Sequence, residues 1–183
     1  MKRLILITGQ PSVGKTTILL RTASALKSKR CKIGGMISRE VREGGTRVGF
    51  EIVDLETGQK GWLANINQPT GPKLGKYRVN LSDLNAIGVR SILNAVADAD
   101  IIIVDEIGPM ELFSLAFKEA VSIAIESEKP VIGTIHYRAR EPLINAIKAR
   151  EDVEIVEVTR ENREQFHNLI INKVINHLTS CAY

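Results

Sequence analysis

Short apolar runs alternate along the chain with longer segments whose apolar residues recur every three or four positions. Such runs predict strands buried on both faces of a parallel sheet, at residues 3–8, 100–106 and 130–136. The helical spacing predicts amphipathic helices at residues 15–29, 80–99, 114–127, 142–149 and 161–178. Buried strands separated by amphipathic helices indicate a doubly wound, mainly parallel α/β sheet in a single domain, residues 1–183.

One part of the chain departs from this alternation. Residues 33–55 contain two strand-like runs joined by "REGG", a pattern typical of a β-hairpin. We expect an inserted antiparallel hairpin at about residues 33–66. Residues 60–77 are rich in Gly, Pro and Asn and are predicted to be a loop with at most one short strand, which would place the lone Trp62 in a loop.

Composition narrows the function classes without choosing one. Apolar residues make up 44% of the 183 residues and aromatic residues only 4%, which argues against base-stacking surfaces for single-stranded nucleic acid. The net charge of +4 favours anionic ligands but does not separate a nucleotide from RNA. Cys31 and Cys181 lack metal-type spacing, and the first apolar run ends at Ile7, too short for a secretory segment or a membrane span. We therefore expect a cytoplasmic protein that does not enter a membrane.

The stretch "GQPSVGKTT" at residues 9–17 follows the first buried strand and precedes a helix. It matches the phosphate-loop pattern G-x-x-x-x-G-K-[ST] in the context that this motif requires. Gly9 and Gly14 let main-chain N–H groups approach the phosphates closely, and the helix N-terminus favours the same anion. Lys15 would carry its charge toward the β- and γ-phosphates, Thr16 would offer a hydroxyl to Mg²⁺, and Thr17 would lie at the α-phosphate.

Two adjacent acids end the second buried strand, in "IIIVDEIGP". We expect this strand to lie beside the first one, so that its tip opens toward the phosphate loop. Asp105 is then placed to hold Mg²⁺ together with Thr16. Glu106 would orient or deprotonate a water molecule, which favours hydrolysis of a nucleoside triphosphate (NTP) as the reaction.

Together with these motifs, "REVREGGTRVGFEIVDLETG", "GKYRVNL", "IIIVDEIGPMEL" and "VTRENR" occur in order and closely resemble the THEP1 family of nucleoside-triphosphatases. The resemblance covers nearly the whole chain. It implies a RecA-like, three-layer P-loop fold and slow Mg²⁺-dependent hydrolysis of several NTPs, ATP and GTP included. It also implies that residues 9–16 and the segment around 101–108 bind the nucleotide.

With Thr17 from the phosphate loop, the predicted nucleotide-binding residues are Gly9, Gln10, Pro11, Ser12, Val13, Gly14, Lys15, Thr16, Thr17, Ile101, Ile102, Ile103, Val104, Asp105, Glu106, Ile107 and Gly108. Lys15 and Glu106 are the predicted catalytic residues.

Weaker candidates surround this predicted site. Glu111 could support the phosphate site or a hydrogen bond within its turn, and Arg47 could extend a guanidinium toward the γ-phosphate. His136 ends the third buried strand and could sense the same phosphate. Asn162 and Arg163 open the last helix, where they could lie near the base or serve as ordinary capping residues. An arginine could also come from a neighbouring subunit; the oligomeric state is open, with a monomer favoured.

Two other functions use the same phosphate cradle. One is a nucleoside or polynucleotide kinase, against which the chain shows no separate acceptor pocket or arginine-rich lid. The other is an NTP-driven switch or motor that acts on a nucleic acid or a protein, which the basic charge permits but the lack of a second domain disfavours. No Asn/Thr-Lys-x-Asp segment is present, so a guanine-selective enzyme is not expected.

Overall fold

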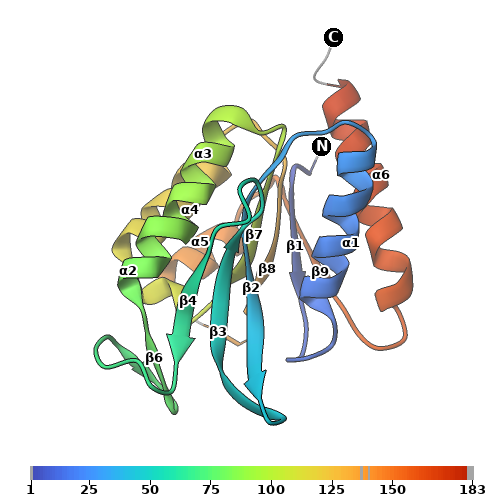
Figure 1. Cartoon of the computed structure of the whole chain (residues 1–183). Coiled ribbons are helices and arrows are strands. Elements are labelled where there is room, and N and C mark those ends of the chain that lie inside the picture. The colour runs from blue at the N-terminus through green and yellow to red at the C-terminus, as the bar shows by residue number, and fades with distance from the viewer. Residues whose placement is uncertain (1, 137, 140, 181–183) are drawn as a thin grey trace.

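A mixed sheet of nine strands separates two layers of helices (Figure 1). This arrangement comes from a computed structural model, which describes residues 2–136, 138–139 and 141–180. The order of strands across the sheet is β5-β6-β4-β3-β2-β7-β8-β1-β9. The predicted fold class, an α/β fold with a mainly parallel sheet and added antiparallel strands, is confirmed.

Five neighbouring strands run parallel and form the centre of the sheet. They are, in spatial order, β2 (Ile33–Glu43), β7 (Ile101–Ile107), β8 (Val131–Ile135), β1 (Leu4–Thr8) and β9 (Val153–Glu157). The apolar runs of β1, β7, β8 and the first half of β2 are buried because helices cover both faces of the sheet, whereas Val153 is the one buried residue of the edge strand β9. The antiparallel strands beyond β2 are β3 (Thr46–Asp54), β4 (Lys60–Asn65), β6 (Tyr77–Val79) and β5 (Lys73–Leu74).

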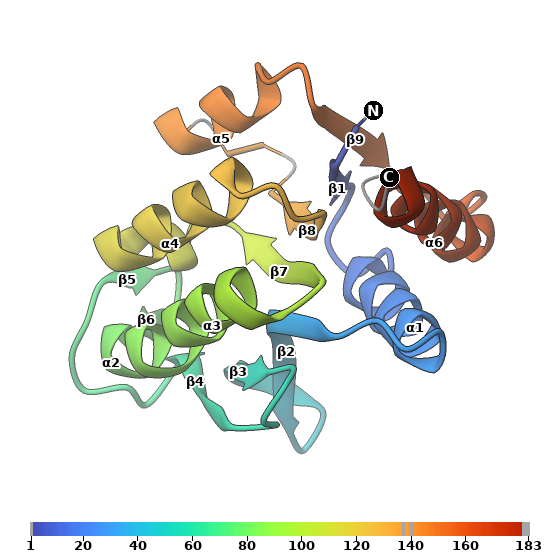
Figure 2. The ribbon, with the colours of Figure 1, turned by 90° about the horizontal axis from the view of Figure 1, so that it is seen from above.

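The helices divide between the two faces, as the view from above shows (Figure 2). One face is covered by α1 (Lys15–Ser28) and α6 (Arg163–Ser180). The other is covered by α2 (Leu81–Asp83), the π-helix η1 (Leu84–Val89), α3 (Arg90–Asp98), α4 (Leu115–Glu126) and α5 (Pro142–Lys148), while the short 3₁₀ helix η2 (Glu111–Phe113) links β7 to α4. A separate apolar core fills each side of the sheet. No helix within the described residues has the length and apolar character needed to cross a membrane.

The hairpin is not a separate insertion, because its first strand, β2, is also a strand of the parallel sheet. Strand β2 has 11 residues; its first half, from Ile33 to Ile37, pairs with β7 in parallel. From Met36 onward the same strand pairs with β3 in antiparallel fashion. The expected hairpin at 33–66 therefore begins inside the parallel core and extends beyond it.

Three expectations about local structure are wrong in detail. Strand β7 does not lie beside β1, because β8 pairs with both and separates them. The segment expected to be a loop at 60–77 holds β4 and β5 and leads into β6, and Trp62, half-buried, lies on β4. The helix expected at 80–99 is interrupted by the π-helical stretch η1, and Asn80 caps its start, with its side chain accepting from the N–H of Asp83 at 3.1 Å.

Candidate nucleotide site

The loop between β1 and α1 leaves main-chain groups open at the carboxyl edge of the sheet. Gly14 is the N-cap of α1 with a φ of 106°, and no described side chain caps this helix end. Gly9 has a φ of 145°, and a Cβ atom there would lie 2.5 Å from the carbonyl oxygen of Val158. Both positions therefore need glycine, and the first amide groups of α1 stay available to an anion.

Lys15 lies over this loop rather than extending into solvent. Its Nζ donates to the carbonyl oxygens of Gly9, at 3.1 Å, and Gln10, at 3.2 Å. The ammonium group is thus held against the loop, which keeps its positive charge beside the N-terminus of α1.

Asp105 is the most buried acid of the site, with 2% of its surface exposed. One oxygen accepts from the Thr16 hydroxyl at 2.6 Å, and the other accepts from the Thr134 hydroxyl. Burial raises the pKa of Asp105 from 3.8 to about 6, against the lowering effect of these two hydrogen bonds; the negative charge of Glu106 raises it further and Lys15 lowers it. The sequence reasoning missed Thr134, although a single hydroxyl inside the apolar strand "VIGTI" was a usable signal.

Glu106 and Glu111 form a second acidic pair next to Asp105. Burial raises the pKa of Glu106, and Lys15 opposes that shift. Burial first, and then the charges of Glu106 and Asp105, raise the pKa of Glu111 well above its usual value. Gly108 separates the two side chains so narrowly that a Cβ atom there would lie 3.2 Å from an oxygen of each. The pair is therefore tightly packed, with Glu111 favoured in its protonated form.

A cavity of about 690 Å³ brings most of the predicted polar residues together. Phosphate-loop residues form one wall, both acids of β7 another, and the β2–β3 hairpin a third. Its lining comprises Pro11, Ser12, Gly14, Lys15, Thr16, Thr17, Ser38, Arg39, Glu40, Arg47, Phe50, Leu63, Leu74, Asp105, Glu106, Pro109, Met110, Glu111 and His136. The buried strand residues Ile101, Ile102, Ile103 and Val104 position the acids from below and do not line the cavity.

Two of the weaker candidates face this cavity from opposite sides. The Arg47 guanidinium is 2.9 Å from a Glu40 oxygen, donates to the Tyr77 hydroxyl at 2.8 Å and lies over the rings of Phe50 and Tyr77. His136 follows β8, where partial burial and then the charges of Lys15 and Lys148 lower its pKa. Arg47 is thus engaged by partners on β2, β3 and β6, while the His136 side chain remains uncharged at neutral pH.

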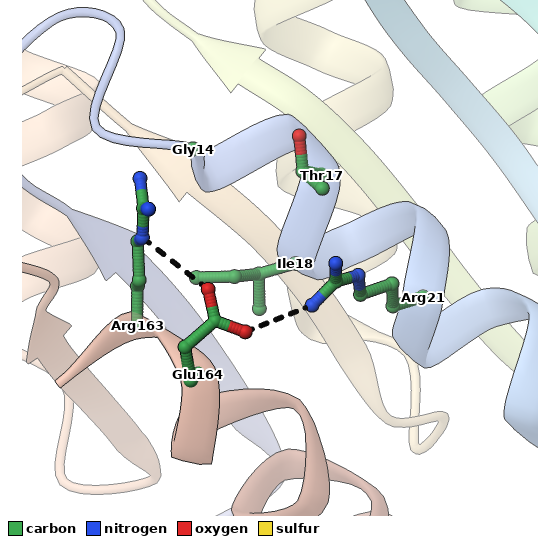
Figure 3. Close-up of a pocket in the computed structure, with 6 residues that line it drawn as sticks. All are labelled: Gly14, Thr17, Ile18, Arg21, Arg163 and Glu164. Carbon is green, nitrogen blue, oxygen red and sulfur yellow. Dashed lines mark hydrogen bonds and ion pairs between the residues drawn. The ribbon is translucent and has the colours of Figure 1, made fainter. Parts of the chain in front are cut away.

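A smaller cavity of about 200 Å³ lies between the first turns of α1 and α6 (Figure 3). Gly14 and Thr17 line it as they line the larger cavity, together with Arg163 from the last helix. Asn162 has a capping role instead: its side chain accepts from the N–H of Thr159 at 2.8 Å and donates to the Glu157 carbonyl at 3.0 Å. Of the two candidates at the start of α6, Arg163 borders this cavity and Asn162 does not.

The donor set of the larger cavity fits Mg²⁺ bound together with a nucleotide. Thr16 and the buried Asp105 offer hard oxygen ligands that already contact each other at 2.6 Å. No cluster of three His, Cys, Asp or Glu side chains that could hold a metal occurs within the described residues. Mg²⁺ is commonly held by one or two protein oxygens, substrate phosphates and waters, so such a sparse set suits it.

A phosphate loop and an acid-tipped strand that meet at the carboxyl edge of a parallel sheet define a P-loop NTPase. A family model described as "NTPase" matches residues 4–171 of the chain. The "Nucleoside-triphosphatase THEP1" of Thermofilum pendens is 48% identical over 160 residues, which cover 87% of this chain and 88% of that protein. Its counterpart in Methanosarcina acetivorans is 43% identical and covers 95% of this chain and 98% of its own. The chain belongs to the THEP1 family of nucleoside-triphosphatases.

Solved structures agree with this assignment. The crystal structure of THEP1 from Aquifex aeolicus has a TM-score of 0.82 at 29% identity, covering 93% of this chain and 98% of that one. The solution structure of a human cancer-related nucleoside triphosphatase has a TM-score of 0.80 at 33% identity, covering 94% and 97%. The predicted family and three-layer P-loop fold are confirmed, and the chain is an NTP phosphohydrolase.

Proposed function

We propose that the chain hydrolyses ATP, GTP and other NTPs to the diphosphate and phosphate, with Mg²⁺ and with little selection among bases. One observation carries this proposal: a single cavity is bordered by the phosphate loop on one side and by Asp105 and Glu106 on the other. A triphosphate held on the loop would thus present its terminal phosphorus to two carboxylates. Loose base selection agrees with the absence of a guanine-reading segment from the sequence.

Each residue of the proposed site has a distinct task. The main-chain N–H groups of the phosphate loop, to which Pro11 contributes none, and the Lys15 ammonium bind and orient the phosphate tail. Glu106 accepts a proton from a water molecule whose oxygen forms the new bond to the γ-phosphorus, while the bond from that phosphorus to the β–γ bridging oxygen breaks. The diphosphate leaves with the bridging oxygen, so atoms and charge balance without a covalent enzyme intermediate.

Thr16 and Asp105 would hold Mg²⁺, and the ion, when bound, neutralises the charge of the β- and γ-phosphates. Thr134 keeps the Asp105 carboxylate oriented through its hydrogen bond. Lys15 also lowers the pKa of both Asp105 and Glu106, which favours the charged forms that the reaction needs.

The test is phosphate release from ATP, GTP, CTP and UTP by wild type and Glu106→Gln, each with Mg²⁺ or with EDTA. We expect comparable turnover of the four NTPs by wild type, loss of turnover with EDTA, and a fall of about 10²-fold or more in Glu106→Gln with NTP binding retained. Unchanged turnover in Glu106→Gln overturns the role of this residue. Turnover that persists without divalent ions overturns the Mg²⁺ dependence.

The kinase alternative is separated from hydrolysis by following labelled γ-phosphate with added nucleosides, nucleotides or nucleic-acid ends. We expect free phosphate as the product in every case, because Glu106 faces the cavity as a base for water. Transfer that outpaces release would favour a phosphotransferase, and release stimulated by a nucleic acid or a protein would favour a switch or motor. The cytoplasmic location stays a prediction; Cys31 is a free thiol, and Cys181 lies outside the described residues.

A further inference from the structure

We propose that the cavity between α1 and α6 is the nucleoside subsite, in which the Arg163 guanidinium stacks on the base without reading its edge. This inference rests on the proposed function, since it concerns the part of the same NTP that lies beyond the phosphates. It assigns a role to a cavity of about 200 Å³ that the hydrolytic chemistry does not use.

The first argument is continuity between the two cavities. Both are bordered by Gly14 and Thr17, at the first turn of α1. The acids of β7 border only the larger one. A triphosphate whose terminal phosphate faces Glu106 would have its α-phosphate near Thr17, so its nucleoside would continue into the smaller cavity.

The second argument is the chemistry of the walls. Ile18, with 4% of its surface exposed, gives the cavity an apolar side, and Arg21 and Arg163 supply planar cations (Figure 3). A guanidinium stacks on any aromatic ring, whatever groups its edge carries. In the described lining, the Glu164 carboxylate is paired with both arginines, and no Asn, Gln or His side chain is present to read a base edge. Such walls suit a purine or a pyrimidine.

The third argument is the way in which Arg163 is held. Glu164 lies between two guanidinium groups, with one oxygen 3.4 Å from Nε of Arg163 and the other 3.2 Å from a terminal nitrogen of Arg21. All three side chains are about half exposed or more, so these ion pairs add little to folding stability. Their effect is instead to join α1 to α6 across the cavity and to orient Arg163 along one wall (Figure 3).

The volume of the smaller cavity, about 200 Å³, agrees with a site that encloses the base but not the whole nucleoside. Sites that enclose a whole drug-sized ligand occupy roughly 300–1,000 Å³, more than this cavity provides. A planar base fits between the two helices, while the ribose would lie toward solvent. Two guanidinium groups against one carboxylate leave the cavity positively charged, as an anionic nucleotide requires.

The experiment compares ligands with and without a nucleoside. Dissociation constants for ATP, GTP, CTP, UTP and inorganic tripolyphosphate are measured by calorimetry with Mg²⁺, for wild type, Arg163→Ala and Arg163→Lys. We expect Arg163→Ala to weaken the four NTPs by roughly three- to thirtyfold, the purines most, and to leave tripolyphosphate within about twofold. Arg163→Lys keeps the charge but loses the planar group, so a smaller loss of the same kind is expected and provides a second test if the alanine variant is unstable.

Arg160→Ala is the matched control, because Arg160 is exposed, lies three residues earlier and does not line the cavity. It removes the same charge and should leave all five affinities unchanged. NTP affinities that stay constant in both Arg163 variants overturn the inference, and so does an equal loss for NTPs and tripolyphosphate, which would place Arg163 at the phosphates. Wild type that binds neither NTPs nor tripolyphosphate refutes the proposed function itself.

Discussion

Replacing Asp105 with Asn should stabilise the nucleotide-free protein at neutral pH, even though it removes a proposed ligand of the metal. The carboxyl group is buried, and desolvation opposes its charged form more strongly than the two threonine hydroxyls favour it. Between about pH 4 and 6 the folded chain keeps a proton on Asp105 that the unfolded chain releases. Folding stability therefore falls as pH rises through this window, and Asn avoids that loss.

The magnitude follows from the pKa. A rise from 3.8 to about 6 corresponds to about 3 kcal/mol above pH 6, at about 1.36 kcal/mol per pH unit. Asn turns one acceptor oxygen into a donor, so one of the hydrogen bonds from Thr16 or Thr134 is weakened at a cost of about 1 kcal/mol. The net gain is about 2 kcal/mol, or roughly 4–8 °C in Tm for a chain of 183 residues.

The assay is thermal unfolding by circular dichroism in EDTA without nucleotide, from about pH 4 to about pH 8. The Asn variant should be slightly less stable than wild type near the acid end and more stable at the neutral end. Asp152→Asn is a control of opposite sign. Asp152 lies 2.9 Å from Arg3 and 2.8 Å from Arg150, and its hydrogen bond to Arg150 lowers its pKa. Its contribution to stability is present above the usual pKa and lost as pH falls, so this control should destabilise at neutral pH.

A difference between Asp105→Asn and wild type that does not vary with pH would refute the reasoning. The same holds for an Asn variant that is less stable at neutral pH, since that result would mean that the carboxylate stabilises the fold. Loss of NTP turnover in this variant is expected in either case, because the proposed Mg²⁺ site loses its charge.

Two further predictions concern the acids beside Asp105. Gly108→Ala should lower turnover about tenfold or more and leave tripolyphosphate binding unchanged. The reason is that the added Cβ atom would lie 3.2 Å from oxygens of both Glu106 and Glu111 and would displace these side chains. Wild-type kinetics in this variant would contradict the tight packing around Gly108. Glu111→Gln should be more stable than wild type at neutral pH, because burial raises the pKa of Glu111 well above its usual value of 4.5. The margin should grow as pH rises above that usual value, since the unfolded chain then releases a proton that the folded chain keeps. Chemical denaturation at several pH values measures this margin, and a margin that is constant with pH would exclude a protonated Glu111.

Much of this architecture follows from local sequence patterns. The apolar runs predict the buried strands β1, β7 and β8, and the phosphate-loop motif predicts the bend at Gly9 and the start of α1. The order of the strands across the sheet does not follow from local patterns. It depends on the helical connections that cross between strands. This is why β8 was not expected between β1 and β7, although its run was correctly identified.

Contacts between segments that are distant in the sequence were also not predicted. The lone hydroxyl in "VIGTI" marks Thr134 as unusual, but the sequence does not show that this hydroxyl donates to Asp105, 29 residues earlier. The strands between residues 60 and 79 are two to six residues long. Each forms on an edge that a neighbour offers, β4 on β3, β6 on β4 and β5 on β6, so their own Gly- and Pro-rich pattern does not predict them. Arg163 was a candidate by its position in the chain, and its place beside Thr17 depends on the packing of α6 against α1.

Strand β2 passes from the parallel core into the hairpin without a break. The base of the hairpin is therefore fixed to the sheet by the pairing of β2 with β7. Arg47 lies on the second strand of the hairpin, β3, and its partner Glu40 lies on the first, β2. A hinge between Ile33 and Ile37 would have to break the pairing of β2 with β7. This pairing therefore opposes a movement of the whole hairpin toward the phosphate loop. Rotation of the Arg47 side chain, released from Glu40 and Tyr77, would bring its guanidinium toward the substrate without breaking that pairing.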